Sequence, residues 1–349
     1  MFRSFLSLRG FSVPLDLPTA GNTLKVPRRV MVLALVGLWG AQAHADGVAS
    51  LKVENDIFAG SSDGHYSNGI EASWAFVPES DHWTRKMGER LTGIPAEEWE
   101  LAAWRLSQQM YTPIDISRSD LVEDDRPYAG LLYGGVSLFD EQQHERWRQL
   151  TGVHVDVGWV GPASLAEPTQ KGIHKITDSD EPEGWSHQLD FEPIVNLAMK
   201  RGWIAKRQLA GLEVDTGPSA GFALGNLYTY VSAGFGARIG QGLERSYSIP
   251  AVAPAATGQS WFRSGSDFAW YVFANFEGRY MAHNLLLDGN TFEDSHSVER
   301  EPWVGDAQAG VTMTWQDWQL SLTNVWRTRE FEGQDRHDEF GSIQLSWQY

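Results

Sequence analysis

Three polar segments of the sequence carry side chains that could do chemistry together. The first segment holds Asn55, Asp56, Asp63 and Ser67. The second holds Asp115, Arg118, Asp120, Asp124, Asp125 and Arg126, and the third holds Lys171, His174, Asp178 and Asp180. Carboxylate and amide oxygens in loops suit a hard cation, so these residues predict a Ca²⁺ site. His174 is then the candidate general base that takes a proton from a water molecule.

Each of these features also has a simpler interpretation. Ser67-Asn68-Gly69 is ordinary turn chemistry, and acidic loops are often only solvated or bound to counterions. A single loop histidine such as His174 is more often a plain surface residue. The run 217–221 matches the G-x-S-x-G pattern of serine hydrolases, but we interpret it as a chance match within a small-residue strand.

Alternating segments on both sides of these loops must position them. The clearest is the last, where Ile343, Leu345, Trp347 and Tyr349 alternate with polar residues and end the chain on an aromatic side chain. One apolar and one polar face, together with 16 Trp residues, favour a membrane barrel over a soluble sandwich. The pattern predicts strands near 48–56, 68–77, 103–111, 128–139, 147–160, 187–200, 207–223, 228–239, 267–281, 302–315, 318–329 and 340–349.

This pattern predicts an all-β fold, a closed transmembrane antiparallel barrel of about twelve strands, with extracellular loops that carry the site. Because the strand number is even, both chain ends lie on the periplasmic side. The connections after the first, third and fifth strands then face outward, and these are the three polar segments. Two connections predicted on the periplasmic side, 78–102 and 240–266, are long for that side.

The start of the chain predicts export. Lys25, Arg28 and Arg29 precede an apolar run from Val30 to Trp39, and Ala43-His44-Ala45 fits a cleavage site. Residues 1–45 are therefore expected to be a signal segment that is removed, and residues 46–349 to be one barrel domain in the bacterial outer membrane.

Composition narrows the partners further. The segment 1–45 holds five basic residues and one aspartate, so residues 46–349 carry a net charge of −21. That charge makes nucleic acid and anionic headgroups poor partners unless a divalent cation bridges the two anions, and we expect no nucleic-acid partner. The chain has no cysteine, which excludes disulfides and thiolate chemistry. After the signal, no run approaches the roughly 20 apolar residues of a membrane-spanning helix.

Several spaced motifs, in order, resemble the outer-membrane lipid A 3'-O-deacylase (LpxR) family. The resemblance covers most of residues 48–200. Its motifs are Glu54-Asn55-Asp56, Tyr66-Ser67-Asn68-Gly69, Tyr111-Thr112-Pro113, Asp125-Arg126-Pro127-Tyr128-Ala129-Gly130, Gly161-Pro162, His174, and Gly184-Trp185 with Gln188. It implies a twelve-stranded barrel that hydrolyses the 3'-linked acyloxyacyl ester of lipid A and depends on Ca²⁺.

The resemblance also implies roles for individual residues. Asn55 and Asp56 match the functional Asn-Asp pair of the family, with Asp56 the expected metal ligand, and His174 matches the catalytic histidine. Ser67 stands where the family has threonine, which keeps the hydroxyl and loses the methyl group. The functional lysine of the second loop has no identical counterpart, so Arg118, or Lys171 on the third loop, is expected to orient a lipid A phosphate.

The expected protein is thus a monomeric Ca²⁺-dependent ester hydrolase. Its site faces the outer leaflet, and its partners are lipid A, lipopolysaccharide and outer-membrane lipids. The departures at Ser67 and Arg118 leave two alternatives open. One is an inactive barrel that acts as a pore or as a lipopolysaccharide-binding structural protein. The other is an outer-membrane phospholipase.

Overall fold

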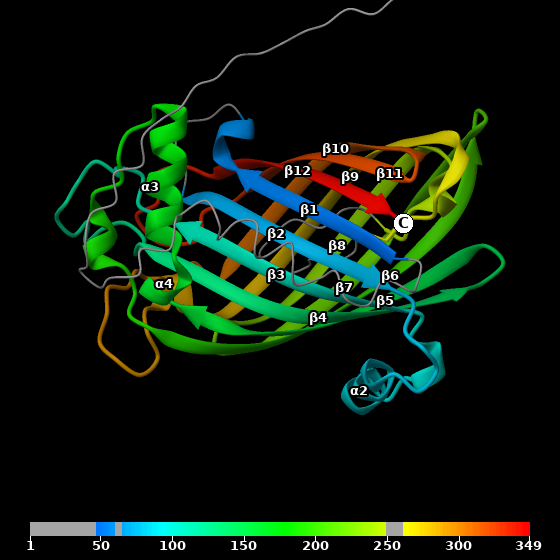
Figure 1. Ribbon diagram of the computed structural model, residues 1–349, viewed down its shortest axis with the longest axis horizontal. Helices are drawn as coiled ribbons and strands as arrows, with labels where there is room; N and C mark the ends of the chain where they lie inside the picture. Colours follow the sequence, from blue (N-terminus) through cyan, green and yellow to red (C-terminus); the bar gives the residue numbers. More distant parts are fainter. Residues whose placement is uncertain (1–46, 60–64, 249–260) are drawn as a thin grey trace, which may run out of the picture. The chain divides into compact units, whose positions relative to one another are not determined.

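Twelve antiparallel strands close into a barrel in the computed structural model, which describes residues 47–59, 65–248 and 261–349 (Figure 1). Each strand pairs with its neighbours in the chain, and β1 pairs with β12 to close the sheet. The strands are β1 (Gly47–Asn55), β2 (Tyr66–Phe76), β3 (Leu101–Tyr111), β4 (Ala129–Gln143), β5 (Trp147–Val160), β6 (Glu192–Leu209), β7 (Leu212–Gly225), β8 (Tyr228–Gln241), β9 (Gly265–Asn284), β10 (Trp303–Gln316), β11 (Trp318–Arg327) and β12 (Asp338–Gln348).

The predicted strands all correspond to observed ones, and the fold class is confirmed. The largest difference is β6, which begins at Glu192 rather than near 187 and continues to Leu209. Residues 184–187, assigned in part to that strand, form a short 3-10 helix instead. The predicted signal segment 1–45 lies outside the described residues, as does Asp63.

Alternation along the strands gives the wall two different faces. Large apolar side chains such as Leu51 and Leu345 are about half exposed on the outside. Charged side chains fill the inside, where they neutralise one another. For example, Asp306 accepts hydrogen bonds from Arg279 at 2.8 Å and from Arg327 at 2.9 Å. Buried charges are stable only when paired in this way, so the lumen is a packed polar core.

The connections contain helices that the alternating pattern did not reveal. From the sequence we expected 78–102 and 161–186 to be irregular connections, and this expectation was wrong. The α-helices are α2 (Trp83–Thr92), α3 (Ala166–Thr177) and α4 (Leu285–Asp288), and the 3-10 helices are η1 (Asp56–Ala59), η2 (Ala96–Glu98), η3 (Pro162–Ser164), η4 (Gly184–His187) and η5 (Leu243–Arg245).

The two ends of the barrel differ. At one end, here called the terminal end, Val48 of β1 pairs with Gln348 of β12, and the chain ends there. At the other, here called the loop end, Asn55 pairs with Gly341. In Figure 1 the helices α3 and α4 lie at the loop end, and α2 lies beside the wall at the terminal end.

The long connection after β8 folds back into the lumen at the terminal end. The hydroxyl of Tyr247 donates to the Asp140 carbonyl oxygen on β4 at 2.7 Å, while the neighbouring Ser246 accepts from Gln319 on β11 at 2.9 Å. These strands lie on opposite sides of the barrel. Tyr247 and Phe262 also belong to one apolar cluster with residues of the inner wall. The described residues of this connection therefore cross the lumen at this end and are called the plug below.

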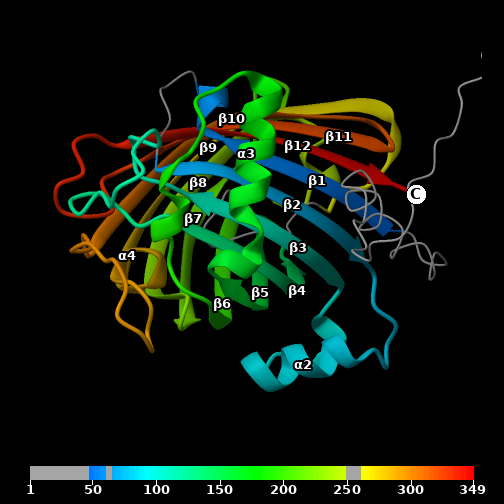
Figure 2. The same cartoon turned by 60° about the vertical axis from the view of Figure 1, so that its left-hand side comes forward.

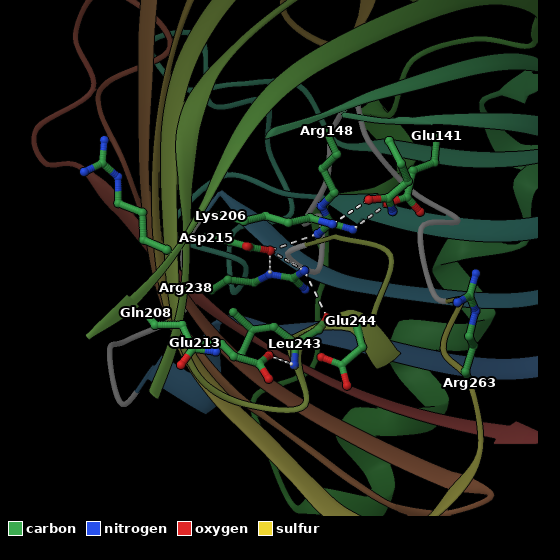
Figure 3. Close-up of a pocket in the computed structure, with 12 residues that line it drawn as sticks. Glu141, Arg148, Lys206, Gln208, Glu213, Asp215, Arg238, Leu243, Glu244 and Arg263 are labelled. Atoms are coloured by element: carbon green, nitrogen blue, oxygen red, sulfur yellow. Dashed lines mark hydrogen bonds and ion pairs between the residues drawn. The ribbon is translucent and has the colours of Figure 1, made fainter. Parts of the chain in front are cut away.

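A polar pocket of about 490 Å³ lies beside this plug (Figure 3). Two guanidinium groups meet on one carboxylate there, with Arg148 at 3.0 Å and Arg238 at 2.7 Å from Asp215. Arg148 also contacts Glu141 at 3.0 Å. Arg238 in addition donates to the carbonyl oxygen of Leu243 in η5, which ties the plug to the wall.

Two further expectations can be checked against the strands. Gly217–Gly221 lies within β7 and forms no strand-to-helix elbow, so the chance-match interpretation is confirmed. None of the described helices is long and apolar enough to span a membrane.

Candidate functional site

A row of paired residues crosses the outer face of the wall at the loop end. Asn55 of β1 pairs with Asn68 of β2, Asn68 with Met110 of β3, and Met110 with Gly130 of β4. Asn55 lies four residues after Leu51, whose side chain is half exposed on the outside, so both share that face. The predicted Asn-Asp pair therefore begins on the lipid-facing side of the wall.

Helix α3 covers the β3 and β4 members of this row from the outside. Gln108 of β3 donates to the Ser164 carbonyl oxygen just before α3 at 2.6 Å. A Cβ on Gly130 would lie 2.1 Å from Ser164 Oγ and 2.4 Å from Ala166 Cβ, so only glycine permits this approach. The buried cluster under the helix is Met110, Tyr128, Ala166 and Trp185. Figures 1 and 2 show α3 across the ends of the first strands.

The end of β1 is held by side-chain hydrogen bonds. Asn55 Nδ2 donates to the Ser67 carbonyl oxygen at 2.7 Å, and Asn55 Oδ1 accepts from the Ile57 amide at 2.8 Å. Ser67 lies where the register of β2 and β3 shifts, and its hydroxyl lies 2.7 Å from Thr112 Oγ1. These bonds bring Asn55, Ser67 and the start of the second loop together.

Asp56 begins η1, which turns over the outside of β12. Its carboxylate is 2% exposed and accepts from the Ile57 amide at 2.9 Å. A Cβ on Gly341 of β12 would lie 2.6 Å from Phe58 Cβ, so this turn packs closely on the outer wall. Ile57 and Phe58 remain about half exposed on the lipid-facing side.

His174 lies on the last turn of α3. The helix ends at Asp178, which has φ 57°. The backbone N–H of Asp178 donates a hydrogen bond to the His174 carbonyl oxygen. The ring Nδ1 lies 2.5 Å from the Asp180 carbonyl oxygen. A carbonyl oxygen can only accept, so Nδ1 carries the proton and Nε2 of the neutral ring keeps its lone pair. Within the described residues, no hydrogen bond joins the His174 ring to Asn55 or Ser67.

The family model described as outer membrane protein LpxR matches residues 30–349. The chain belongs to the LpxR family. LpxR from Salmonella typhimurium has a similar structure, with a TM-score of 0.71 at 17% identity, and the match covers 86% of this chain and 99% of that one. This barrel is accordingly an integral outer-membrane protein.

Other barrels are more distant. The translocator domain of the autotransporter NalP from Neisseria meningitidis has a TM-score of 0.38 at 8% identity, over 92% of this chain and 94% of that one. None of the curated proteins matches this LpxR-family chain.

Asn68 is a residue of this LpxR-family site that the sequence interpretation missed. From the sequence we placed it at the start of the predicted strand 68–77 and gave it no role beyond turn chemistry, whereas in β2 it is 7% exposed. Its Oδ1 is buried and has no hydrogen-bond partner among the described residues. A buried amide oxygen without a partner is costly, so this oxygen is suited to bind a ligand atom. The sequence feature that could have identified Asn68 is an amide side chain on the apolar face of a predicted membrane strand.

The two residues expected to hold a phosphate are paired within their own segments. Arg118 Nη2 lies 2.6 Å from Asp120 Oδ2 in the second loop, and that hydrogen bond holds the pKa of Asp120 below its usual value. Lys171 Nζ lies 3.1 Å from Glu167 Oε1, one turn earlier on α3. All four side chains are exposed by a third or more, so a ligand can reach them.

The second and third loops of this LpxR-family barrel are joined by backbone hydrogen bonds. The Glu183 amide donates to the Ile116 carbonyl oxygen at 2.9 Å, and the Leu189 amide donates to the Tyr128 carbonyl oxygen at 2.9 Å. The Tyr128 hydroxyl also donates to the Ile116 carbonyl oxygen at 3.3 Å. Arg118 and His174 therefore belong to connected loops.

His65, also missed from the sequence, joins the first loop to the second and to β12. Its side chain is 1% exposed, with Nε2 3.1 Å from Asp125 and Nδ1 2.7 Å from Asp338. Burial opposes the charge on the ring, but the hydrogen bonds to the two carboxylates outweigh burial and raise the pKa of His65 to about 9. Phe331 packs edge-on against the ring at 5.1 Å. The ring is therefore a buried cation at neutral pH.

The acidic side chains of the second loop serve local contacts. Asp115 accepts from the Ser117 hydroxyl at 2.6 Å, and Asp125 accepts from the Ile114 amide at 2.9 Å. Among the described residues, no group of three or more His, Asp or Glu side chains could hold a metal ion. Asn68 and the end of β1 lie in the same row, so a cation bound there would have a mixed set of amide, carboxylate and backbone ligands.

Proposed function

We propose that this chain is a lipid A deacylase that hydrolyses the 3'-linked acyloxyacyl ester in the outer leaflet, with Ca²⁺ as its cofactor. The observation that carries the proposal is the row from Asn55 to Gly130, which lies on the lipid-facing side of the wall and whose β3–β4 part is covered by α3. A lipid ester reaches this place without leaving the membrane. The loop end then faces the cell exterior, and the terminal end faces the periplasm.

The oxygen atoms beside this row fit a hard cation. Asn68 Oδ1 is buried without a partner among the described residues, and Asp56 directly follows Asn55 in the chain. Ca²⁺ accepts such a mixture of amide, carboxylate, carbonyl and water oxygens. When bound, the cation polarises the ester carbonyl and stabilises negative charge on its oxygen. Asn68 and Asp56 are the residues that would hold it.

His174 acts as the general base. Its Nε2 lone pair accepts a proton from the attacking water, while the Asp180 carbonyl oxygen holds the Nδ1 proton and fixes the tautomer. The water oxygen bonds to the ester carbonyl carbon, and the bond to the sugar oxygen breaks. The same Nε2–H then returns the proton to that leaving oxygen, which balances the reaction.

Asn55 and Ser67 assist through their remaining donors. Asn55 Nδ2 uses one N–H for the Ser67 carbonyl oxygen and keeps a second N–H for the developing oxyanion. The Ser67 hydroxyl can accept from Thr112 and donate its own proton to the same oxygen. Arg118 or Lys171 would bind a lipid A phosphate, because each is exposed and can exchange its present carboxylate partner for the phosphate.

The decisive experiment measures release of the 3'-acyloxyacyl fragment by mass spectrometry, from lipid A with purified protein and Ca²⁺. His174→Ala should lower the rate about 10²–10⁴-fold, because a general base contributes that much. Lys175→Ala, on the exposed face of the same helix, is the matched control and should stay near wild type. Release that persists in the His174→Ala variant, or in excess chelator, contradicts the mechanism.

The two alternatives have their own readouts. A pore requires an open lumen, whereas Tyr247 and Phe262 are buried across it in the described part of the terminal end. Wild-type protein in a planar bilayer is therefore expected to show no stable conductance steps. A phospholipase would hydrolyse glycerophospholipid faster than lipid A in the release assay, and that result would replace the proposed substrate.

A further inference from the structure

The connection between β2 and β3 packs on the outer face of the wall at the terminal end. Ala102 lies two residues before Trp104 on the exposed face of β3, and Leu138 is its partner on β4, yet both are 0% exposed. They belong to one cluster with Phe76, Val153 and Trp99, and Trp99 comes from the connection itself. This connection therefore occupies a place that lipid would otherwise fill.

Helix α2 is fixed rigidly to this patch. A Cβ on Gly88 would lie 2.5 Å from the Trp99 indole, so helix and indole are in direct contact. Arg85 donates to the Pro78 carbonyl oxygen at 2.8 Å and to the Glu97 carbonyl oxygen at 3.1 Å, which holds both sides of the connection. In Figures 1 and 2 the helix extends sideways from the wall.

One stripe of α2 is apolar; its two ends are exposed, while Met87 between them packs against the cluster on the wall. Trp83, Met87 and Leu91 are four residues apart, so they lie within about 80° of one another around the helix. Trp83 is 48% and Leu91 is 43% exposed. The Trp83 ring lies 5.8 Å from the Trp104 ring on the outer wall, so the stripe continues the apolar surface of the barrel.

Charge is ordered around the rest of the helix. Lys86 and Arg90 flank the stripe on the side away from the wall, and both are exposed. Glu89 lies roughly on the opposite side of the helix from the stripe, because successive residues are about 100° apart around the helix axis. The helix carries three basic residues and one acidic residue, in a chain with a net charge of −17. The apolar stripe, the basic residues beside it and the acidic residue opposite it correspond in order to the acyl chains, the phosphates and the water at an anionic lipid surface.

We propose that α2 is a membrane-surface helix that binds the phospholipid of the periplasmic leaflet. Trp83 and Leu91 enter the acyl boundary, Lys86 and Arg90 contact lipid phosphates, and Glu89 faces water. The assignment to the periplasmic leaflet rests on the orientation given under the proposed function. The binding itself rests on the continuity with Trp104 and on the order of charge.

The test uses the absence of cysteine from the chain. Leu91→Cys, Lys86→Cys and Glu89→Cys are each labelled with a nitroxide and reconstituted in vesicles of phosphatidylethanolamine and phosphatidylglycerol. Collision rates with oxygen and with a nickel chelate give the depth of each label. The label of Leu91→Cys should lie about 5–10 Å below the phosphates, that of Lys86→Cys at their level, and that of Glu89→Cys in water. Heat-dependent electrophoretic mobility verifies that each barrel is folded.

Any other order of depth overturns the proposal. If all three labels are in water, α2 does not bind lipid. If the label of Leu91→Cys is shielded from both reagents, protein covers the stripe. Neither result depends on ester hydrolysis.

Orientation is measured separately in intact cells with a membrane-impermeant maleimide. Ile176 on α3 is 86% exposed, so Ile176→Cys should react at once. Glu89→Cys should react only after the outer membrane is permeabilised. The reverse pattern overturns the periplasmic assignment and the proposed orientation, while the depth order would still stand.

Discussion

The buried His65 cation should make the stability of the barrel depend on pH. Replacing it by glutamine keeps a hydrogen-bonding side chain of similar length and removes the charge that Asp125 and Asp338 share. The two carboxylates then face each other without a cation between them. Because they come from the second loop and from β12, His65→Gln should destabilise the loop end.

The magnitude follows from the pKa of His65, which is raised to about 9. An unfolded histidine has a pKa near 6.5, and each unit of difference corresponds to about 1.4 kcal/mol. The protonated ring thus contributes about 3 kcal/mol to the free energy of unfolding. Since the pKa is higher in the folded state, the full contribution is present below pH 6.5 and is lost as the pH rises to 9.

This effect is measured by unfolding vesicle-reconstituted protein with guanidinium at several pH values from about 6 to about 10, a range that includes both pKa values of His65. Tryptophan fluorescence reports the unfolding. The free energy of unfolding of wild type minus that of His65→Gln should fall by about 1.4 kcal/mol per pH unit between the two pKa values. His144→Gln, at an exposed histidine in the β4–β5 turn, is the control and should match wild type throughout.

A difference between wild type and His65→Gln that stays constant with pH would refute the reasoning, because an uncharged ring cannot lose a charge. The same slope in His144→Gln would show that the pH dependence arises elsewhere.

Three further changes have expected outcomes. Asn68→Ala should raise the Ca²⁺ concentration for half-maximal lipid A hydrolysis about tenfold, the effect of losing about 1.4 kcal/mol of cation binding. Tyr247→Ala combined with Phe262→Ala should open stable conductance steps in a planar bilayer, since the plug loses both rings that cross the lumen. Gly130→Ala should lower hydrolysis while the barrel stays folded, because the new methyl group meets Ser164 and displaces α3, at a cost of about 1–3 kcal/mol.

Each of these changes also has a result that would contradict it. An unchanged Ca²⁺ requirement in Asn68→Ala would mean that this oxygen holds no cation. A closed Tyr247→Ala and Phe262→Ala variant would mean that other groups seal the lumen. Gly278→Ala is the control for Gly130→Ala, because a Cβ at Gly278 meets nothing within 4 Å, and equal losses in both would remove the argument from α3.

The sequence predicted the strands well because a barrel wall imposes one rule along its whole length. Every second side chain must suit lipid and the others must suit the packed lumen, so the alternation in β12 recurs in strands such as β1 and β3. Helices α2 and α3 escaped this rule. Each is short, lies in a connection and packs on only one side, so period-two alternation carries no information about it.

The site was predictable only in part, for a related reason. Asn55, Ser67 and the histidine of α3 stood in recognisable motifs, and the structure accounts for the hydrogen bonds that each one makes. The importance of His65 depends on Asp338, which is 273 residues away, and that of Asn68 on the lack of a partner. Neither property can be read from neighbouring residues.

Helices α2 and α3 cover the same sector of the wall at opposite ends, and their spacing has a consequence for membrane thickness. On β3 the two covered positions are Ala102 and Met110, eight residues apart. That is about 27 Å along the strand, or roughly 20 Å across the bilayer at a tilt of about 40°. This is close to the apolar band of about 25 Å that an outer-membrane barrel presents. The two helices thus bracket the hydrocarbon layer, so thickening or thinning the bilayer should shift the depth of the Asn55 row relative to the ester bonds of the surrounding lipid.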